Sequence, residues 1–230
     1  MLADLVDADV PESSQSFAER LGQWLDFKSS LALLSVLDRA VAGATEPAVS
    51  APEGAAMREA LARVRNALTK SIMTDEVFKP GKPLVELSAA PVAVDCSADF
   101  APFHSYYLAH QRDISANVAA LRASARAALS KRSPALKRLA TLDAVLDQAM
   151  AAREGSLLAT VPGLLAKRFE QLRKASQAAD EPDQPVQSDG WLGVFHQEMR
   201  AVLLAELELR LQPVAGLIAA LDNEGSISGE

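Results

Sequence analysis

The chain has 230 residues and a formal net charge of −7, and 49% of its residues are hydrophobic although only 5% are aromatic. This length allows one or two domains with a real core, and the acidic balance argues against nucleic-acid binding by the surface as a whole. A core so poor in aromatic residues must consist mostly of alanine, leucine and valine, and alanine and leucine are the strongest apolar helix formers. We therefore expect an all-α protein, a multi-helix bundle with a long irregular connection in the middle.

Cysteine usage and hydropathy indicate the cellular compartment. Cys96 is the only cysteine, which excludes an intrachain disulfide and is typical of a protein of the reducing cytoplasm. The acidic start of the chain lacks the basic and apolar regions of a signal peptide. No apolar stretch approaches the roughly 18 residues that a membrane-spanning helix needs. We expect a cytoplasmic protein with no direct membrane insertion.

The first helical pattern has several candidate caps within six residues. Ser13 or Ser14 can accept hydrogen bonds from backbone N–H groups, and Ser16 and Glu19 have the Ser-x-x-Glu spacing of a capping box, so the exact start stays open. Large apolar residues then recur at helical spacing, namely Phe17, Leu21, Trp24 and Leu25. A second run, capped by Asp26 or a following serine, contains Leu31, Leu34, Leu37 and Val41. Two interpretations of Phe17 and Trp24 stay open: packing in the core, or a docking face for a partner helix.

The middle of the chain changes character twice. Residues 55–73 have apolar positions three or four apart and predict a helix with a mainly basic exposed surface. Residues 74–102 are punctuated by proline and glycine, and we expect a long connection that is either a partner-binding arm or a simple linker. The predicted organisation is an N-terminal helical subdomain at 1–75, a proline-rich connection at 76–102 and a C-terminal helical bundle at 103–230. One continuous domain is the alternative.

Four further helices are predicted in the C-terminal part. The first covers residues 103–131 and forms a hairpin with the second, which starts at Ser133-Pro134 and ends near residue 155. A third begins near Pro162, after a turn at residues 157–161, and is followed by an acidic loop at 178–190. The last begins at Trp191, and Pro213 predicts a kink or a break within it.

One cluster has the composition of a chemical site. His104, His110 and Asp113 lie close in sequence, but two ligands on one helical face are spaced three or four residues apart, and the histidines are six apart. We therefore interpret this cluster as a polar helix surface, and His196 as a solvated or core-edge histidine. Cys96 has no histidine near it in sequence to act as a base. We predict no catalytic residues, no metal site and no cofactor.

A basic segment lies between Asp113 and Asp143, where no acidic residue occurs. Its cations are Arg122, Arg126, Lys131, Arg132, Lys137 and Arg138. Arg122 and Arg126 are four residues apart and so lie on the same helical face. Three interpretations remain: a solvated face, a surface for an acidic protein partner, and, less favoured, a nucleic-acid surface, since no aromatic residues are interleaved for base stacking.

Both ends of the chain carry motifs of a known family. The N-terminal motif consists of Val10–Ser13, Gln15–Leu21 and Gly22–Asp26, and the weaker C-terminal one of Leu209–Val214 and Gly216–Ile218. In these stretches the chain resembles an uncharacterised proteobacterial domain-of-unknown-function family. Its members look like small soluble neighbours of a membrane motor pair, one protein similar to a flagellar stator and one with a peptidoglycan-binding OmpA-like domain. That arrangement is similar to a Zorya-type anti-phage defence operon, and the resemblance implies no catalytic residues.

These observations lead to one functional hypothesis and two alternatives. We expect a non-enzymatic cytosolic helical protein-interaction subunit, with a protein partner encoded nearby and with a homo-oligomer as a further option. The resemblance implies an accessory or effector role in a motor-linked anti-phage defence system. The partner-binding residues would be Phe17, Trp24 and the six cations of the basic segment. The alternatives are a nucleic-acid-binding module that uses the basic hairpin and a cryptic hydrolase that uses His104, His110 or Cys96.

Overall fold

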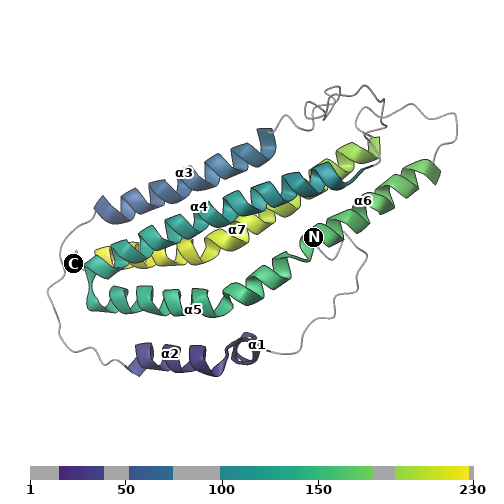
Figure 1. The fold of residues 1–230 in the computed structure, drawn as a ribbon. Coiled ribbons are helices and arrows are strands. Elements are labelled where there is room, and N and C mark those ends of the chain that lie inside the picture. The colour runs from purple at the N-terminus through teal and green to yellow at the C-terminus, as the bar shows by residue number, and fades with distance from the viewer. Residues whose placement is uncertain (1–15, 39–51, 75–98, 179–189, 228–230) are drawn as a thin grey trace, which may run out of the picture. The chain divides into compact units, whose positions relative to one another are not determined.

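The computed structural model describes residues 16–38, 52–74, 99–178 and 190–227. This part of the chain is helical and contains no strand, so the expected all-α multi-helix bundle is confirmed (Figure 1). Its helices are α1 (Phe17–Trp24), α2 (Phe27–Asp38), α3 (Pro52–Thr74), α4 (Ala101–Arg132), α5 (Pro134–Leu158), α6 (Val161–Ala178) and α7 (Gly190–Ile227). None of the helices in these ranges has the length and apolar character required to cross a bilayer.

The chain divides into two compact units, each made of separate chain segments. Unit 1 comprises Met1–Val10, Ala67–Ile114 and Ala159–Leu207. Unit 2 comprises Pro11–Asn66, Ser115–Leu158 and Glu208–Glu230. The long helices α3, α4 and α7 therefore contribute one segment to each unit. The predicted organisation into 1–75, 76–102 and 103–230 stays a prediction, and most of the predicted connection lies outside the described residues.

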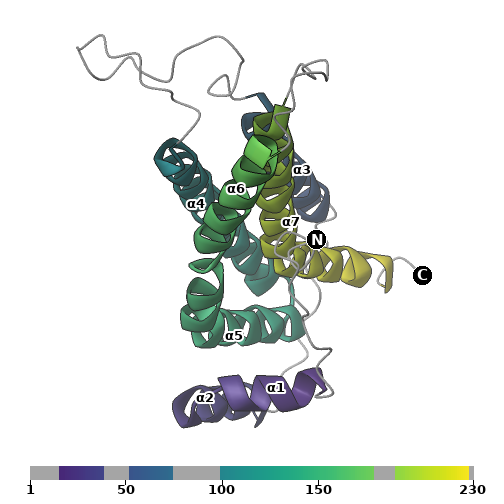
Figure 2. The ribbon, with the colours of Figure 1, turned by 90° about the vertical axis from the view of Figure 1, so that its right-hand side faces the viewer.

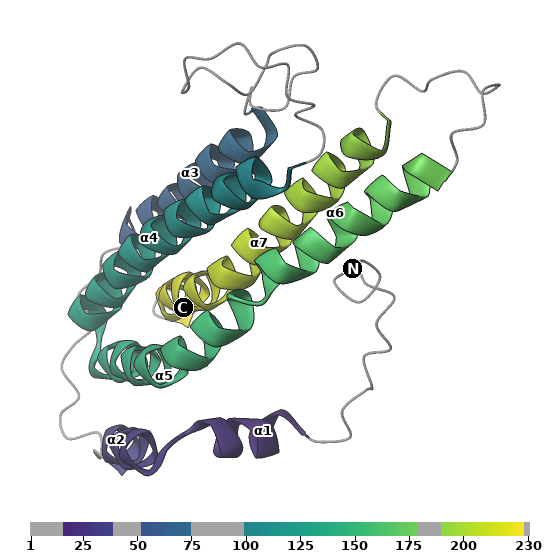
Figure 3. The ribbon, with the colours of Figure 1, turned by 45° about the vertical axis from the view of Figure 1, so that its right-hand side comes forward.

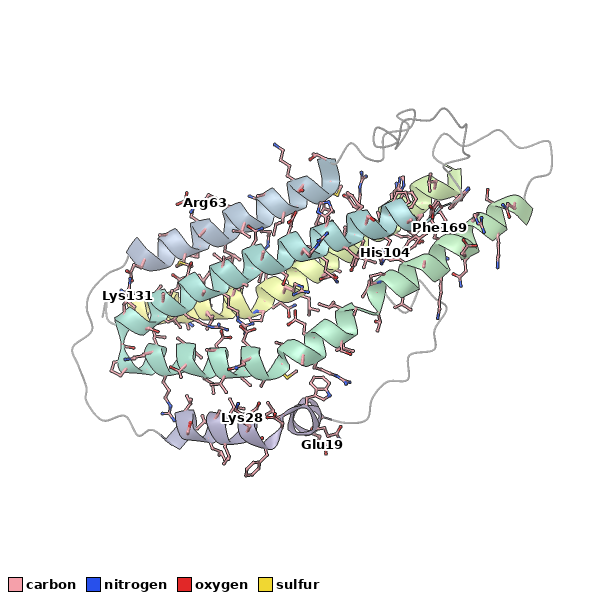
Figure 4. All side chains as sticks on the ribbon, in the orientation of Figure 1. Glu19, Lys28, Arg63, His104, Lys131 and Phe169 are labelled. Atoms are coloured by element: carbon pink, nitrogen blue, oxygen red, sulfur yellow. The ribbon has the colours of Figure 1, made fainter. Side chains whose placement is uncertain are left out.

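Unit 1 has an aromatic core. Phe103 of α4 lies 5.5 Å from Phe169 of α6 and 5.4 Å from Phe195 of α7, measured between ring centroids. Trp191 approaches Phe169 to 5.1 Å, and the ring planes of most of these pairs are tilted or perpendicular, the arrangement that aromatic quadrupoles favour. Figure 4 labels Phe169 and the exposed His104 among these helices. Few aromatic residues occur in the chain, and they are concentrated in this unit.

A buried carboxylate is also part of unit 1. Glu206 of α7 is only 5% exposed, and it accepts hydrogen bonds from the Tyr107 hydroxyl at 2.7 Å and from Gln111 Nε2 at 3.2 Å. Gln111 occupies a position where the apolar spacing of α4 would place a hydrophobic residue, and this contact explains the polar side chain. Arg168 of α6 and Glu198 of α7, both half-buried, form a bidentate pair at 2.6 and 2.8 Å.

The core of unit 2 is aliphatic. It consists of Val118, Leu121, Ala125, Leu129, Leu136, Ala140, Leu211, Val214, Leu217, Ile218 and Leu221. Helix α3 is joined to α7 by two ion pairs, Arg58 with Asp222 at 3.2 Å and Arg65 with Glu208 at 2.9 Å. Gly54 is buried where these helices meet, since a Cβ there would lie 2.5 Å from the Asp222 carboxylate. A glycine in this turn allows the close approach.

The helix ends follow from local sequence in most places. The Ser133 hydroxyl accepts from the Leu136 N–H at 3.2 Å, so the predicted start of α5 at Ser133-Pro134 is confirmed. The predicted turn at 157–161 is wrong in extent, because α5 continues to Leu158 and α6 already begins at Val161. No break occurs at Pro213, which lies inside α7. The carbonyl that loses its partner there belongs to Leu209, whose side chain is 57% exposed, so it lies on the side of the helix that faces water.

Candidate functional site

Helices α1 and α2 begin at well-formed caps. The Ser16 N–H donates to Glu19 Oε2 at 2.8 Å, and the Glu19 N–H donates to Ser16 Oγ at 3.3 Å, so the Ser16–Glu19 capping box, one of the candidate caps, is present. Asp26 caps α2, because its Oδ1 accepts from the Ser29 N–H at 2.7 Å. Hydrogen bonds from Ser29 lower the pKa of Asp26 below its usual value. The first residues of α2 are thus fixed by side chains of the same short stretch.

The far end of α2 is held by another helix of unit 2. Helix α2 packs along α5 in Figures 1, 2 and 3, on the side of α5 away from α4. Arg138 of α5 donates from Nε to the Val36 carbonyl at 3.0 Å and from Nη2 to the Leu37 carbonyl. These carbonyls lie in the last turn of α2, where intrahelical donors run out and a cation is favoured by the helix dipole. Both ends of α2 are therefore fixed.

The outer face of α2 is apolar and exposed. Phe27 is 79% exposed, and Leu31, Leu34 and Leu37 are 50%, 53% and 51% exposed. These residues recur every three or four positions and form one stripe, while Ala32, Leu33 and Val36 on the other side are half-buried. A helix that is apolar all round is normally buried on all sides. The contact with α5 covers only one side, so the outer stripe of Phe27, Leu31, Leu34 and Leu37 has the character of a binding surface.

Of the two predicted N-terminal aromatic residues, the structure describes the side chain of Trp24 but not that of Phe17. Phe17 lies in α1, but its side chain is outside the part that is described. Trp24 is half-buried, and the Arg153 guanidinium of α5 lies 5.5 Å from the centroid of its ring. Trp24 thus contacts α5 while part of its surface stays accessible. Sequence spacing identified Phe17 and Trp24 as candidate partner-binding residues. It missed Phe27, and it gave no reason to expect Leu31, Leu34 and Leu37 at the surface.

Two arginines of the basic segment have carboxylate partners within unit 2. Arg122 binds Asp143 and Asp147, each at 2.6 Å, and Arg126 binds the same two residues at 2.6 and 2.7 Å. Burial opposes ionisation of Asp143, but hydrogen bonds from both arginines outweigh it and lower its pKa. The sequence counted these two cations as positive surface. The correction is that they belong to an ion-pair cluster between α4 and α5.

The rest of the segment is divided between structural and exposed positions. Arg138 holds the end of α2, and Arg132 is half-buried. Lys131, labelled in Figure 4 at the end of α4, and Lys137 of α5 are exposed. The positive surface at this turn is therefore smaller than the sequence indicates, which weakens the nucleic-acid alternative, because that binding depends on accessible cations.

The histidine cluster is not a polar helix surface. His104 and Asp113 are exposed, but His110 is 5% exposed and lies 4.4 Å from the ring of Tyr106, which is also buried. The correction follows from the helical period, which turns His110 and Tyr106 into the core of unit 1 and His104 away from it. Within the described ranges, no three His, Cys, Asp or Glu side chains gather as metal ligands would. Cys96 lies outside those ranges.

His196 lies at the edge of the aromatic core of unit 1, as expected. Its ring is 5.2 Å from Phe103 and 6.5 Å from Phe195, measured between centroids. Burial, with a smaller contribution from the nearby charge of Arg200, lowers its pKa to about 4. The imidazole is therefore neutral at pH 7 and behaves there as part of the core.

Comparison with known proteins gives a family but no activity. No curated protein and no solved structure matches the chain. One family model covers residues 1–223, nearly the whole chain, which confirms the expectation of an uncharacterised domain family. The chain belongs to the family described as "Protein of unknown function (DUF3348)".

Proposed function

We propose that this protein is a non-enzymatic helical subunit of the cytoplasm that binds a protein partner through the outer stripe of α2. The observation that carries the proposal is the exposure of four large apolar side chains along one helical face. Contiguous apolar patches of this kind mark interaction surfaces on soluble proteins. The Asp26 cap and the Arg138 contacts fix α2 before any partner arrives, and a preorganised surface loses less conformational freedom on binding.

We propose further that the partner is encoded nearby and that the subunit is an accessory or effector component of a motor-linked anti-phage defence system. This part is supported by the resemblance alone, which rests on Val10–Asp26 and Leu209–Ile218. The exposed cations Lys131 and Lys137 would add to the outer stripe of α2 if the partner is acidic there.

The test is co-purification of the tagged full chain with the products of the neighbouring genes, with masses measured by light scattering. We expect a stoichiometric complex with the unaltered chain and its loss with the double variant Leu31→Glu/Leu34→Glu. Leu157→Glu is the matched control, because Leu157 is 51% exposed on α5 of the same unit. This control should keep the complex.

Two results would contradict the proposal. If no neighbouring product co-purifies with the unaltered chain, the nearby-partner role fails. If a complex forms but survives the double variant, the outer stripe of α2 is not its interface. Circular dichroism of both variants checks that the helical fold is retained.

A further inference from the structure

The kind of partner can be inferred from the size of the outer stripe of α2. The stripe runs from Phe27 to Leu37, roughly three turns or about 15 Å of helix. Four side chains that are half to four-fifths exposed offer on the order of 400 Å². A stable dimer buries roughly 800 Å² on each side, whereas one amphipathic helix covers a surface of this length. The area therefore fits a single helix better than a second copy of the chain.

The charges around the stripe specify its partner further. The carboxylates of Asp26 and Glu19 are engaged with backbone N–H groups at the starts of α2 and α1. Lys28, labelled on α2 in Figure 4, is exposed, and so is Arg153, whose guanidinium lies against the Trp24 ring. At the other end of α2 lies Arg138. The Phe27 end of the stripe is thus bordered by two exposed cations, Lys28 and Arg153, which favour acidic side chains in the partner there, whereas α2 ends in the acidic Asp38.

The exposed charge of Lys28 disfavours a parallel symmetric contact between two copies. Such a contact is isologous, so every residue of the stripe meets the stripe of the other copy. In a parallel pairing Lys28 would approach Lys28 of the other copy, which places like charges together. An antiparallel pairing would bring Lys28 toward the acidic end of the other α2 at Asp38, so that arrangement is disfavoured by the small area alone.

We infer that the outer stripe of α2 binds an amphipathic helix of a partner protein, with leucine-like side chains along three turns and acidic side chains at the end that meets Lys28 and Arg153. The inference rests on the proposed interaction function and adds the chemistry of the partner. Apolar contacts supply the affinity, and Lys28 and Arg153 select the charge.

The test uses two labelled synthetic peptides with the same leucine stripe, one flanked by glutamates and the other by lysines. Fluorescence anisotropy with the full chain should show the acidic peptide binding about five to ten times more tightly, the gain that a few exposed ion pairs can supply. This preference should shrink at high salt. Leu31→Glu/Leu34→Glu should abolish binding, and Leu157→Glu should leave it intact.

A charge reversal keeps the inference falsifiable. Lys28→Glu should reduce the preference for the acidic peptide about threefold while the fold is retained, because one attractive pair becomes repulsive. Equal binding of the two peptides, or binding of neither, overturns the inference. A dimer of the unaltered chain that Leu31→Glu dissociates also overturns it, in favour of a second copy. If neither peptide binds but co-purification still depends on Leu31 and Leu34, only the partner chemistry is wrong and the proposed function stands.

Discussion

Two neighbouring regions of unit 2 differ in whether their side chains find partners within the chain. Between α4 and α5, Arg122, Arg126, Asp143 and Asp147 form a cluster in which each arginine binds both aspartates. On the outer stripe of α2, four large apolar side chains face solvent. The difference teaches that the charged side chains between α4 and α5 find their partners in each other. Helix α2, in contrast, buries one apolar face against α5 and leaves a second apolar face exposed.

Breaking the arginine–aspartate cluster should have the largest effect. Asp143→Ala leaves Arg122 and Arg126, which are 15% and 21% exposed, sharing Asp147 alone. We expect the free energy of unfolding to fall by about 2–3 kcal/mol, because an incompletely compensated and largely buried charge is costly. Denaturant titration followed by circular dichroism measures the change.

The matched control for this prediction is Arg63→Ala. Its ion pair with Glu59 is largely exposed on both sides, at 64% and 71%. The expected loss is within about 0.5 kcal/mol, as is usual for surface pairs. If Asp143→Ala lowered the free energy of unfolding no more than this control, the cluster would behave as ordinary surface ion pairs. The contrast between the α4–α5 pair and the outer stripe of α2 would then be wrong.

The comparison becomes sharper with His196, which changes from an uncharged to a charged group on acidification. Its pKa is about 4 in the folded state, below the usual 6.5 of an unfolded chain. The unfolded chain therefore binds more protons between these values, and the free energy of unfolding decreases as pH falls from about 6.5 to about 4. Discounted for the partial exposure of the ring, we expect a loss of roughly 1–2 kcal/mol.

The pH dependence is measured by thermal unfolding at closely spaced pH values. His196→Leu should flatten the stability profile between pH 6.5 and 4, because the titrating group is gone. His104→Gln, at an exposed position of α4, should retain the profile of the unaltered chain. An unchanged slope in His196→Leu would show that other groups cause the acid sensitivity.

Arg138 links the two regions that are compared, since it comes from α5 and binds the last turn of α2. Arg138→Ala should cost about 1 kcal/mol, because the carbonyls of Val36 and Leu37 lose a charged donor but can turn to water. Amide hydrogen exchange should become faster in α2 and stay unchanged in α4. Uniform protection across both helices would mean that α2 does not depend on this contact.

The sequence predicted well what depends on neighbouring residues. The Ser16–Glu19 box, the Asp26 cap and the start of α5 at Ser133 each depend on a spacing of three residues; all three are present, the first two having been candidates among neighbouring alternatives. Arg122 and Asp143 are 21 residues apart, so their pairing depends on how α4 meets α5. The i and i+4 spacing of both Arg122–Arg126 and Asp143–Asp147 was a usable indication of it. For α2, periodicity identified apolar residues that favour burial. It could not show whether another helix of the same chain or a partner protein buries them.

The smallest expected effect tests the open face of α2 directly. Leu34→Ser on the outer stripe should change the free energy of unfolding by no more than about 0.5 kcal/mol, because Leu34 is already 53% exposed in the folded chain. Leu33→Ser, one residue away on the half-buried side, should cost about 1–2 kcal/mol through lost burial against α5. Denaturant titrations of the two variants make a matched pair, since they differ only in the side of α2. Equal losses would show that the outer stripe is covered within the chain, and a Leu34→Ser protein that is fully stable yet fails to bind its partner would show that the stripe serves binding instead.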